Sequence, residues 1–362
     1  MKRVLLEMYL NKNLGDDLFL RIIAERYKNA RFYVAASNKY PLVAGLKNVH
    51  GRSLVRRIID KCAGILSRKS KWFGKRFEAE VLLGGSMFIE QKGTRDELKK
   101  NIRGRFKNNI PLFILGANFG PYKNNYYLEE YAKVFKKAED VCFREEYSGG
   151  LFKKLENVRV APDIVFGLDS EKYKAKQEKK VVVSVIDLET REKLKQFQAD
   201  YENKILEIAE KYASSGYNVV LMSFCEAEGD KDAINRILQR TSNSKISSYY
   251  YRGNIGEAVR QISSSEIVVG TRFHSVVLGI VFGKKVLPVI YSNKTRNMLE
   301  DIGFSGRTIE LKNISKLKAD RIDSWLTEYG NVDRLNRASE AHFEKLDGLL
   351  ERIEQWRLSI KN

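Results

Sequence analysis

The sequence predicts an α/β fold of two doubly wound, Rossmann-like domains that face each other across a cleft. Three observations predict it. The chain has 362 residues, a length typical of two domains. Short, continuous apolar runs alternate with segments of helical periodicity, as in parallel sheets covered on both faces. The charged stretch 171–180 interrupts this alternation once, like a linker, and the alternation restarts after it.

The first half contains six apolar runs that we expect to be strands, at residues 2–10, 31–37, 79–86, 111–120, 141–145 and 158–163. A helix is expected at 18–27, where Leu18, Ile22 and Tyr27 lie near one helical face. Further helices are expected at 52–66, 94–108, 126–138 and 147–155. Residues 1–170 are therefore predicted to form the N-terminal domain.

The second half repeats the pattern. Strands are expected at 181–187, 218–224, 246–251, 266–270, 285–291 and 307–311. Helices are expected at 199–215 and after Gly229, Asn254, Phe273 and Lys294. We predict a C-terminal domain at 181–330, followed by a long helical tail at 331–362.

The composition indicates a globular protein with a strong basic excess. Lys and Arg number 65 against 46 for Asp and Glu, a formal net charge of +19. This charge favours anionic partners of any kind: phosphorylated metabolites, acidic glycans, anionic lipids or nucleic acid. Cys62, Cys142 and Cys225 lie far apart, without metal-ligand spacing, so we expect no metal site and a reducing compartment. No apolar run approaches the about 18–20 residues of a membrane span, and we expect a cytoplasmic protein.

Polar residues follow strand after strand, where ligands of doubly wound sheets bind. In the first half these residues and their neighbouring glycines are Asn13, Gly15, Asp16, Gly84, Gly85, Ser86, Asn118 and Arg144. Gly15 is expected to allow a tight turn, and Asp16 or Asp17 to cap the next helix. Arg144 has two interpretations: it binds an acidic substrate group, or it pairs with Glu145 or Asp163.

In the second half, Arg272, His274 and Ser275 follow the strand at 266–270, where a helix is expected to begin. Helix N-termini favour anions, arginine offers a planar charged fork, and histidine exchanges protons near neutral pH. The alternative is that Arg272 pairs with a carboxylate while His274 packs locally. Lys294 adds a cation after the next strand.

These strand ends, in this order, resemble the polysaccharide pyruvyl transferase family over about residues 10–305. The matching residues are Asn13, Gly15 and Asp16; Gly84 and Gly85; Gly116, Gly120 and Pro121; Arg144, Glu145 and Ser148; Pro162 and Asp163; and Arg272, His274 and Lys294. Ser86 stands where the family usually has a third glycine.

The resemblance implies a glycosyltransferase-B-like fold and transfer of a pyruvyl group from phosphoenolpyruvate, as co-substrate without another cofactor, to two hydroxyls of a sugar. His274 would be the general acid or base, and Arg272, Lys294 and Ser275 would bind phosphoenolpyruvate. Asp16, with Asn13, would hold or deprotonate acceptor hydroxyls from across the cleft. The acceptor would be a sugar of a polysaccharide or of its lipid-linked or nucleotide-linked precursor.

Residues 52–76 form a basic amphipathic segment with nine basic residues and one acidic residue. Such a segment suits an anionic membrane surface, which would place the protein at the inner face of the plasma membrane. A helix packed on the sheet with a charged outer face explains the pattern equally well.

Three other functions remain open: a nucleotide-sugar glycosyltransferase of the same architecture, a nucleic-acid-binding protein, and an inactive partner in glycan assembly. Fold alone does not exclude the first. No RNA- or DNA-binding motif appears, so no nucleic-acid partner is expected. The presence of Arg272 and His274 disfavours the third.

Overall fold

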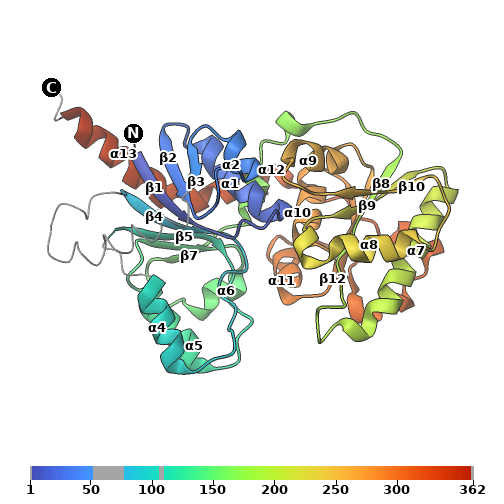
Figure 1. Ribbon diagram of the computed structural model, residues 1–362, viewed down its shortest axis with the longest axis horizontal. Coiled ribbons are helices and arrows are strands. Elements are labelled where there is room, and N and C mark those ends of the chain that lie inside the picture. Colours follow the sequence, from blue (N-terminus) through green and yellow to red (C-terminus); the bar gives the residue numbers. More distant parts are fainter. Residues whose placement is uncertain (1, 52–76, 106–109, 360–362) are drawn as a thin grey trace. The chain divides into compact units, whose positions relative to one another are not determined.

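The computed structural model describes residues 2–51, 77–105 and 110–359, which form two compact units (Figure 1). Unit 1 comprises Met1–Tyr9, Phe19–Ile164 and Ala338–Asn362, and unit 2 comprises Leu10–Leu18 and Val165–Arg337. The units differ from the predicted domains at both ends of the chain. The loop after the first strand belongs with the second half, and the end of the tail belongs with the first.

Unit 1 contains a seven-stranded sheet of order β3-β2-β1-β4-β5-β6-β7, in which all neighbouring strands are parallel. The strands are β1 Lys2–Glu7, β2 Ala30–Val34, β3 Val49–Gly51, β4 Ala79–Leu83, β5 Leu112–Ala117, β6 Asp140–Phe143 and β7 Val158–Val160. Its helices are α1 Leu14–Arg26, whose first turns belong to unit 2, α2 Pro41–Gly45, α4 Arg95–Arg105, α5 Asn125–Phe135 and α6 Glu146–Leu151. The short elements α2 and β3 were not predicted, and the helix expected at 52–66 lies outside the described residues.

Unit 2 contains a six-stranded parallel sheet of order β10-β9-β8-β11-β12-β13. The strands are β8 Lys180–Ser184, β9 Asn218–Ser223, β10 Ile246–Tyr250, β11 Ile267–Gly270, β12 Lys285–Ile290 and β13 Ile309–Glu310. The helices between them are α7 Gln198–Ser214, α8 Asp230–Leu238, α9 Ile255–Ser263, α10 Phe273–Val281 and α11 Asn293–Asp301. Strand order reverses between β8 and β11, and such a switch point opens a binding crevice at the carboxyl ends of the strands.

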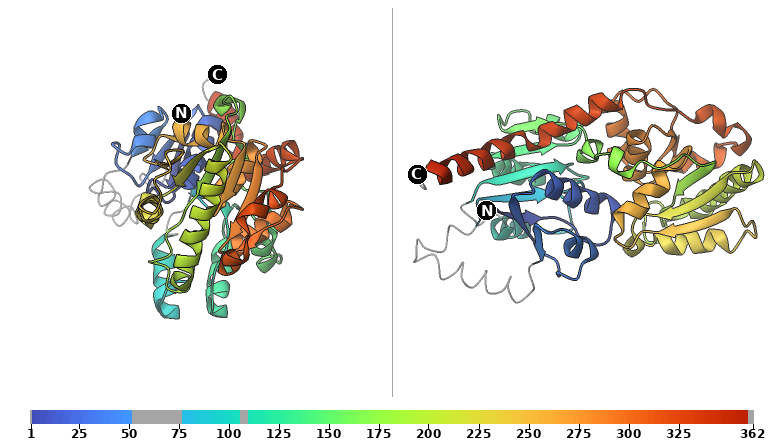
Figure 2. Two further views of the ribbon diagram at one scale, coloured as in Figure 1. Left: turned by 90° about the vertical axis from the view of Figure 1, so that its right-hand side faces the viewer. Right: turned by 90° about the horizontal axis from the view of Figure 1, so that it is seen from above.

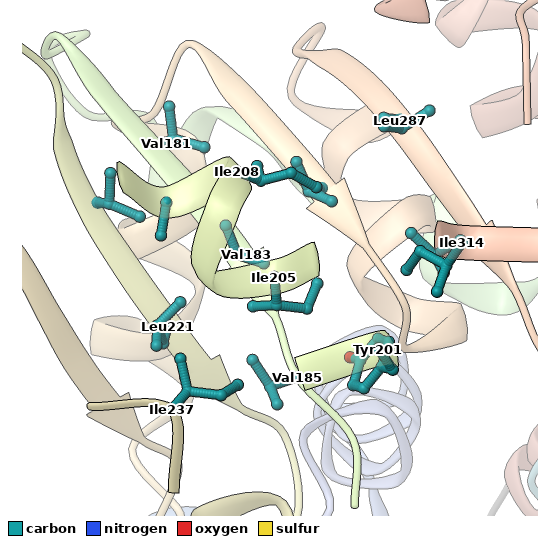
Figure 3. Packing of buried hydrophobic residues seen from close by; sticks show 14 of the residues in the cluster. Val181, Val183, Val185, Tyr201, Ile205, Ile208, Leu221, Ile237, Leu287 and Ile314 are labelled. Carbon is teal, nitrogen blue, oxygen red and sulfur yellow. The ribbon is translucent and has the colours of Figure 1, made fainter. Parts of the chain in front are cut away.

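The sheet of unit 2 is held by a core that follows directly from the sequence periodicity. Val181 and Val183 alternate along β8, and Tyr201, Ile205 and Ile208 recur at helical spacing along α7. Figure 3 shows these side chains packed between the helix and the strands, and all five are fully buried. Two doubly wound α/β units were predicted, and this prediction is confirmed.

The long C-terminal helical tail that the sequence predicts is present, and it is built from two helices with a 3-10 turn between them. Helix α12 spans Val332–Ser339, a 3-10 turn covers Glu340–Phe343, and α13 spans Glu344–Ser359. Figure 2 shows α13 lying along unit 1, where Leu346 and Leu350 are buried. The 3-10 turn between the two helices buries both His342 and Phe343 in unit 1.

The charged stretch 171–180 is more ordered than a linker. A 3-10 helix spans Glu171–Tyr173, and the Tyr173 ring is buried. The Ser263 hydroxyl of α9 donates a hydrogen bond to the Tyr173 carbonyl at 2.8 Å. This contact ties the start of the stretch to unit 2.

Candidate functional site

The candidate site lies in unit 2, where β11 gives way to α10 at the switch point. The Ser184 hydroxyl at the end of β8 accepts hydrogen bonds from the backbone N–H groups of Thr271 and Arg272, at 2.8 and 3.0 Å. The Ser275 hydroxyl lies 2.7 Å from that of Ser184 and donates to the Arg272 carbonyl at 2.6 Å. Ser275 is fully buried, and its hydroxyl stabilises the junction; that it also binds phosphoenolpyruvate stays a prediction.

Arg272 is a buried cation held by two carboxylates. Its Nε donates to Asp230 Oδ2 at 3.1 Å, and its Nη2 donates to Asp230 Oδ1. Its Nη1 donates to Glu228 Oε2 at 2.5 Å. Asp230 is fully buried, and its Oδ2 also accepts hydrogen bonds from the backbone N–H groups of Phe224 and Cys225, both at 3.0 Å. The pairing of Arg272 with carboxylates, left open from the sequence, is therefore present.

The two carboxylates have opposite pKa shifts. Burial raises the pKa of Asp230, although Arg272 works against the rise. Burial would also raise the pKa of Glu228, but the charges of Arg272, Arg191 and Lys294 outweigh it and lower that pKa. Burial disfavours the charged form of Arg272, yet the paired carboxylates raise its pKa above the usual range. The positive side chains around Glu228 therefore favour its ionised form.

The loop after β1 closes over this junction within unit 2. The Leu14 N–H donates to the Phe224 carbonyl at 3.0 Å, and the Tyr251 hydroxyl donates to Asp17 Oδ2 at 2.6 Å. The Asn13 side chain bridges the loop: its Oδ1 accepts from the Gly15 N–H at 3.0 Å, and its Nδ2 donates to Glu228 Oε1 at 3.3 Å. Asn13 was predicted to lie across a cleft from Arg272, and the structure instead places both in one unit.

A glycine is required at position 15 by its close approach to His274, and not by a tight turn as the sequence predicts. It is the second residue of α1, and the left-handed residue of the loop is Lys12, with φ 52°. A Cβ atom on Gly15 would lie 1.8 Å from His274 Nδ1. The glycine therefore lets the backbone of α1 approach the imidazole, and the half-buried Asp16 follows in the first turn.

His274 and Lys294 complete the predicted set in this unit. The His274 ring is half-buried and lies edge-on to Phe273, with centroids 5.0 Å apart. The Lys294 ammonium lies 6.0 Å from the centroid of the same Phe273 ring. Shared neighbours thus link five predicted residues: Asn13 and Arg272 both contact Glu228, Gly15 lies against His274, and His274 and Lys294 both lie near Phe273.

Three charged residues of the site were not singled out from the sequence: Arg191, Glu228 and Asp230. Arg191 Nη2 donates to Glu228 Oε2 at 2.8 Å, and its guanidinium stacks over the Tyr291 ring, 5.5 Å from the centroid. Lys294, Arg272 and Arg191 lower the pKa of Tyr291, although burial acts to raise it. Glu228 and Asp230 follow β9 at its carboxyl end, so the strand-end rule that found Arg272 was the signal available for them.

The predicted residues of unit 1 form a separate, buried polar cluster. Arg144 Nη1 donates to Asp163 Oδ2 at 2.9 Å, and its Nη2 donates to Asn118 Oδ1 at 2.7 Å. The Ser86 hydroxyl donates to Asn118 Oδ1 at 3.4 Å, and a Cβ on Gly85 would lie 2.6 Å from Arg144 Nη1. Pairing of Arg144 with Asp163 was one of its two interpretations, and it is the one seen.

Gly84 lies beside this cluster at the end of β4, with φ 145°. This conformation favours glycine, so Gly84 is explained by the backbone of the turn. Together with the burial of Arg144 and Asn118, it points to a structural role for the glycine-rich turn.

Other features of the described residues do not mark a second site. A cavity of about 390 Å³ includes Ile267 and Lys285, the first residues of β11 and β12, and so lies at the end of the sheet opposite Arg272. Residues 2–51, 77–105 and 110–359 contain no group of three His, Cys, Asp or Glu side chains arranged to bind a metal ion. Within the same ranges, no helix is long and apolar enough to cross a membrane.

Two solved structures with a similar fold contain either UDP with a separate sugar or a UDP-sugar. HepE of Anabaena in complex with UDP and glucose is 13% identical, with a TM-score of 0.55 over 99% of this chain and 100% of that one. UDP-GlcNAc 2-epimerase of Neisseria meningitidis, bound to UDP-GlcNAc, is 13% identical, with a TM-score of 0.59 over 96% and 99%. These neighbours establish a glycosyltransferase-B-like fold, as expected, and at this identity they establish nothing further.

Sequence comparison identifies the family. The amylovoran biosynthesis protein AmsJ of Erwinia amylovora is 21% identical over 329 residues, covering 79% of each chain. The sequence profile of the polysaccharide pyruvyl transferases matches residues 13–293. That range begins at Asn13, runs through Arg272 and His274, and ends one residue before Lys294. The chain belongs to the polysaccharide pyruvyl transferase family and is a transferase.

Proposed function

We propose that this transferase moves a pyruvyl group from phosphoenolpyruvate to two hydroxyls of one sugar, forming a cyclic ketal and releasing phosphate. One observation carries the proposal. Gly15 and His274 lie far apart in the sequence, and α1 approaches the imidazole so closely that no side chain fits at position 15. This contact joins the strand-end segment of Asn13 and Asp16 to that of Arg272 and His274.

The reaction needs proton transfers at carbon and at oxygen. One sugar hydroxyl attacks C2 of phosphoenolpyruvate and loses its proton, while the methylene carbon gains a proton and becomes a methyl group. A second hydroxyl then attacks C2, the C–O bond to phosphate breaks, and the second hydroxyl proton leaves to solvent or to phosphate. General acid and base catalysis of such steps contributes about 10²- to 10⁴-fold.

The residues divide these tasks by their chemistry. His274 supplies the proton to the methylene carbon, because imidazole exchanges protons near neutral pH. Asp16 accepts the proton of the acceptor hydroxyl, and Asn13 orients that hydroxyl. Arg272 and Lys294 balance the negative charge of phosphoenolpyruvate and of the departing phosphate. No cofactor beyond this co-substrate takes part in the proposed reaction.

The acceptor is proposed to be a sugar of an exopolysaccharide or of its precursor on a lipid diphosphate, reached at the inner face of the plasma membrane. The relative's role in amylovoran biosynthesis supports a polysaccharide acceptor. Membrane contact would fall to the basic segment 52–76, which lies outside the described residues. Pelleting with anionic vesicles at low salt tests this point, and absence of binding would rule it out.

Release of phosphate from phosphoenolpyruvate, measured with a panel of sugar acceptors, tests the proposed reaction. Release that depends on one acceptor, with a mass gain on the product matching a pyruvate ketal, is the expected result. The His274→Ala variant is expected to lose about 10²- to 10⁴-fold in turnover. Turnover of His274→Ala within threefold of wild type would refute its role. Transfer from UDP-sugars without any phosphoenolpyruvate reaction would instead favour a glycosyltransferase.

A further inference from the structure

The Glu228 carboxylate lies among three donors that come from three different loops. Its Oε2 accepts from Arg272 Nη1 at 2.5 Å and from Arg191 Nη2 at 2.8 Å, and its Oε1 accepts from Asn13 Nδ2 at 3.3 Å. These loops follow β11, β8 and β1 respectively. Two guanidinium groups and an amide that converge on one carboxylate form the arrangement by which proteins bind carboxylate and phosphate ligands.

The donors are held in place by contacts that do not involve Glu228. Asp230 holds Nε and Nη2 of Arg272. Arg191 Nε donates to the Asp187 carbonyl at 3.1 Å, and its guanidinium stacks on an aromatic ring. The Asn13 Oδ1 accepts from the backbone of α1. The three donors would therefore keep their positions if the Glu228 side chain moved away.

Glu228, in contrast to Asp230, is placed so that it can leave. It ends a short 3-10 turn, Glu226–Glu228, and Gly229 follows in the left-handed conformation with φ 85°. Its side chain is 41% exposed, whereas that of Asp230 is 0% exposed and accepts two backbone hydrogen bonds. Asp230 is therefore the permanent counter-ion of Arg272, and Glu228 the exchangeable one.

We propose that Asn13, Arg191 and Arg272 form an oxyanion subsite, and that Glu228 fills it in the free protein until a substrate carboxylate or phosphate displaces it. The inference rests on the proposed function in taking phosphoenolpyruvate as the natural source of that oxyanion. It adds Arg191 to the substrate-binding residues and gives Glu228 the part of an internal competitor. A competitor of this kind reduces the apparent affinity to the intrinsic affinity multiplied by the fraction of time for which the subsite is free.

Calorimetric titration of the full chain with inorganic phosphate and, separately, with pyruvate tests the subsite at constant ionic strength. Glu228→Gln keeps the side-chain shape but removes the charge that competes with the anion. We expect Kd for at least one anion to fall about tenfold in this variant. A lower Kd for phosphate alone assigns a phosphate subsite, and a lower Kd for pyruvate alone assigns a carboxylate subsite. If Kd is unchanged or higher for both anions, the proposal is overturned, because Glu228 would then only organise the cations.

Glu226→Gln is the matched control. Glu226 lies on the same turn and pairs with Arg252 at 2.8 Å, away from Arg272. This substitution removes the same charge from the same turn and is expected to leave Kd unchanged. If both variants bind the anion more tightly to the same extent, the effect comes from the change in net charge alone, and the subsite is also overturned.

A crystal of the wild-type protein soaked in phosphate tests the subsite without any variant. Phosphate within hydrogen-bond distance of Arg191 Nη2 and Arg272 Nη1, with Glu228 turned away, is the expected result. Phosphate bound elsewhere with Glu228 in place would contradict it. These measurements need neither turnover nor an acceptor sugar. If the anion binds as expected but no phosphate is released from phosphoenolpyruvate, only the proposed reaction is rejected. If the protein turns over but the anion does not bind at this subsite, only this inference is rejected.

Discussion

Replacement of Gly15 by alanine is expected to disable the transferase while leaving its fold intact. The new Cβ would lie 1.8 Å from Nδ1, 2.4 Å from Cε1 and 2.6 Å from Cγ of His274. Ordinary contact begins at 3.4 Å, so the ring must recede by about 1.6 Å. We expect the ring rather than α1 to move, because α1 is anchored through the buried contact between Tyr251 and Asp17.

The size of the effect follows from how strictly catalysis depends on position. A displacement of about 1 Å of a catalytic group can lower the rate by ~10²-fold. The stability changes little, because the preference of a helix for alanine over glycine, about 0.5–1 kcal/mol, works against the cost of moving the ring. Turnover of Gly15→Ala should therefore fall about 100-fold or more, while the free energy of unfolding changes by no more than about 1 kcal/mol.

The chain offers a matched control for this substitution. Gly256 is the second residue of α9, as Gly15 is of α1, and a Cβ there would make an ordinary contact of 3.6 Å with Asn254 Oδ1. Gly256→Ala should keep wild-type turnover. Phosphate release from phosphoenolpyruvate and urea unfolding are measured for both variants. Gly15→Ala with turnover within threefold of wild type would refute the argument that the α1 backbone positions His274.

Three further predictions concern stability and are measured by urea unfolding. Burial lowers the pKa of His342 to about 4, below its unfolded value of 6.5, so the unfolded chain binds more protons than the folded chain between these pH values. The free energy of unfolding should therefore fall by about 3 kcal/mol as the pH drops from 6.5 to 4. The variant His342→Gln should reduce that loss. Asp230→Asn should destabilise the protein by about 3–5 kcal/mol, because it removes the buried charge opposite Arg272, and an effect below 1 kcal/mol would contradict the pairing. Tyr251→Phe should cost about 1–3 kcal/mol, because it leaves the buried Asp17 carboxylate without this hydroxyl, and an unchanged midpoint would show that the bond is unimportant.

The sequence predicted the architecture well because hydrophobic periodicity is a local signal. Runs such as the one at 181–187 and the helical spacing of Tyr201, Ile205 and Ile208 are set by which faces must be buried. The short β3 and α2 gave no periodic signal, since three or five residues are too few to show one. The 3-10 turn within the tail buries His342 and Phe343, and the helical pattern of the tail does not reveal this turn.

The sequence predicted site residues within single loops, but it did not predict the contacts between loops. Arg272 and His274 were found because they follow one strand, but the partners of Arg272 lie on another loop. Glu228 and Asp230 look like ordinary charged loop residues until the fold brings them to the same edge of the sheet. The contact between Gly15 and His274 was equally hidden, because a local sequence does not state which sheet its loop will pack against.

The assignment of Leu10–Leu18 to unit 2 limits how this enzyme can be divided. The chain passes between the units four times, and α1 belongs to both. A fragment of residues 165–337 would have the Arg272 junction but lack Asn13 and Gly15, and no single cut separates the two units. A chimera that takes the whole of unit 2 from a relative must therefore transplant 10–18 together with 165–337. Recombination at a simple midpoint would combine residues 10–18 from one parent with residues 165–337 from the other, and so divide the candidate site between them.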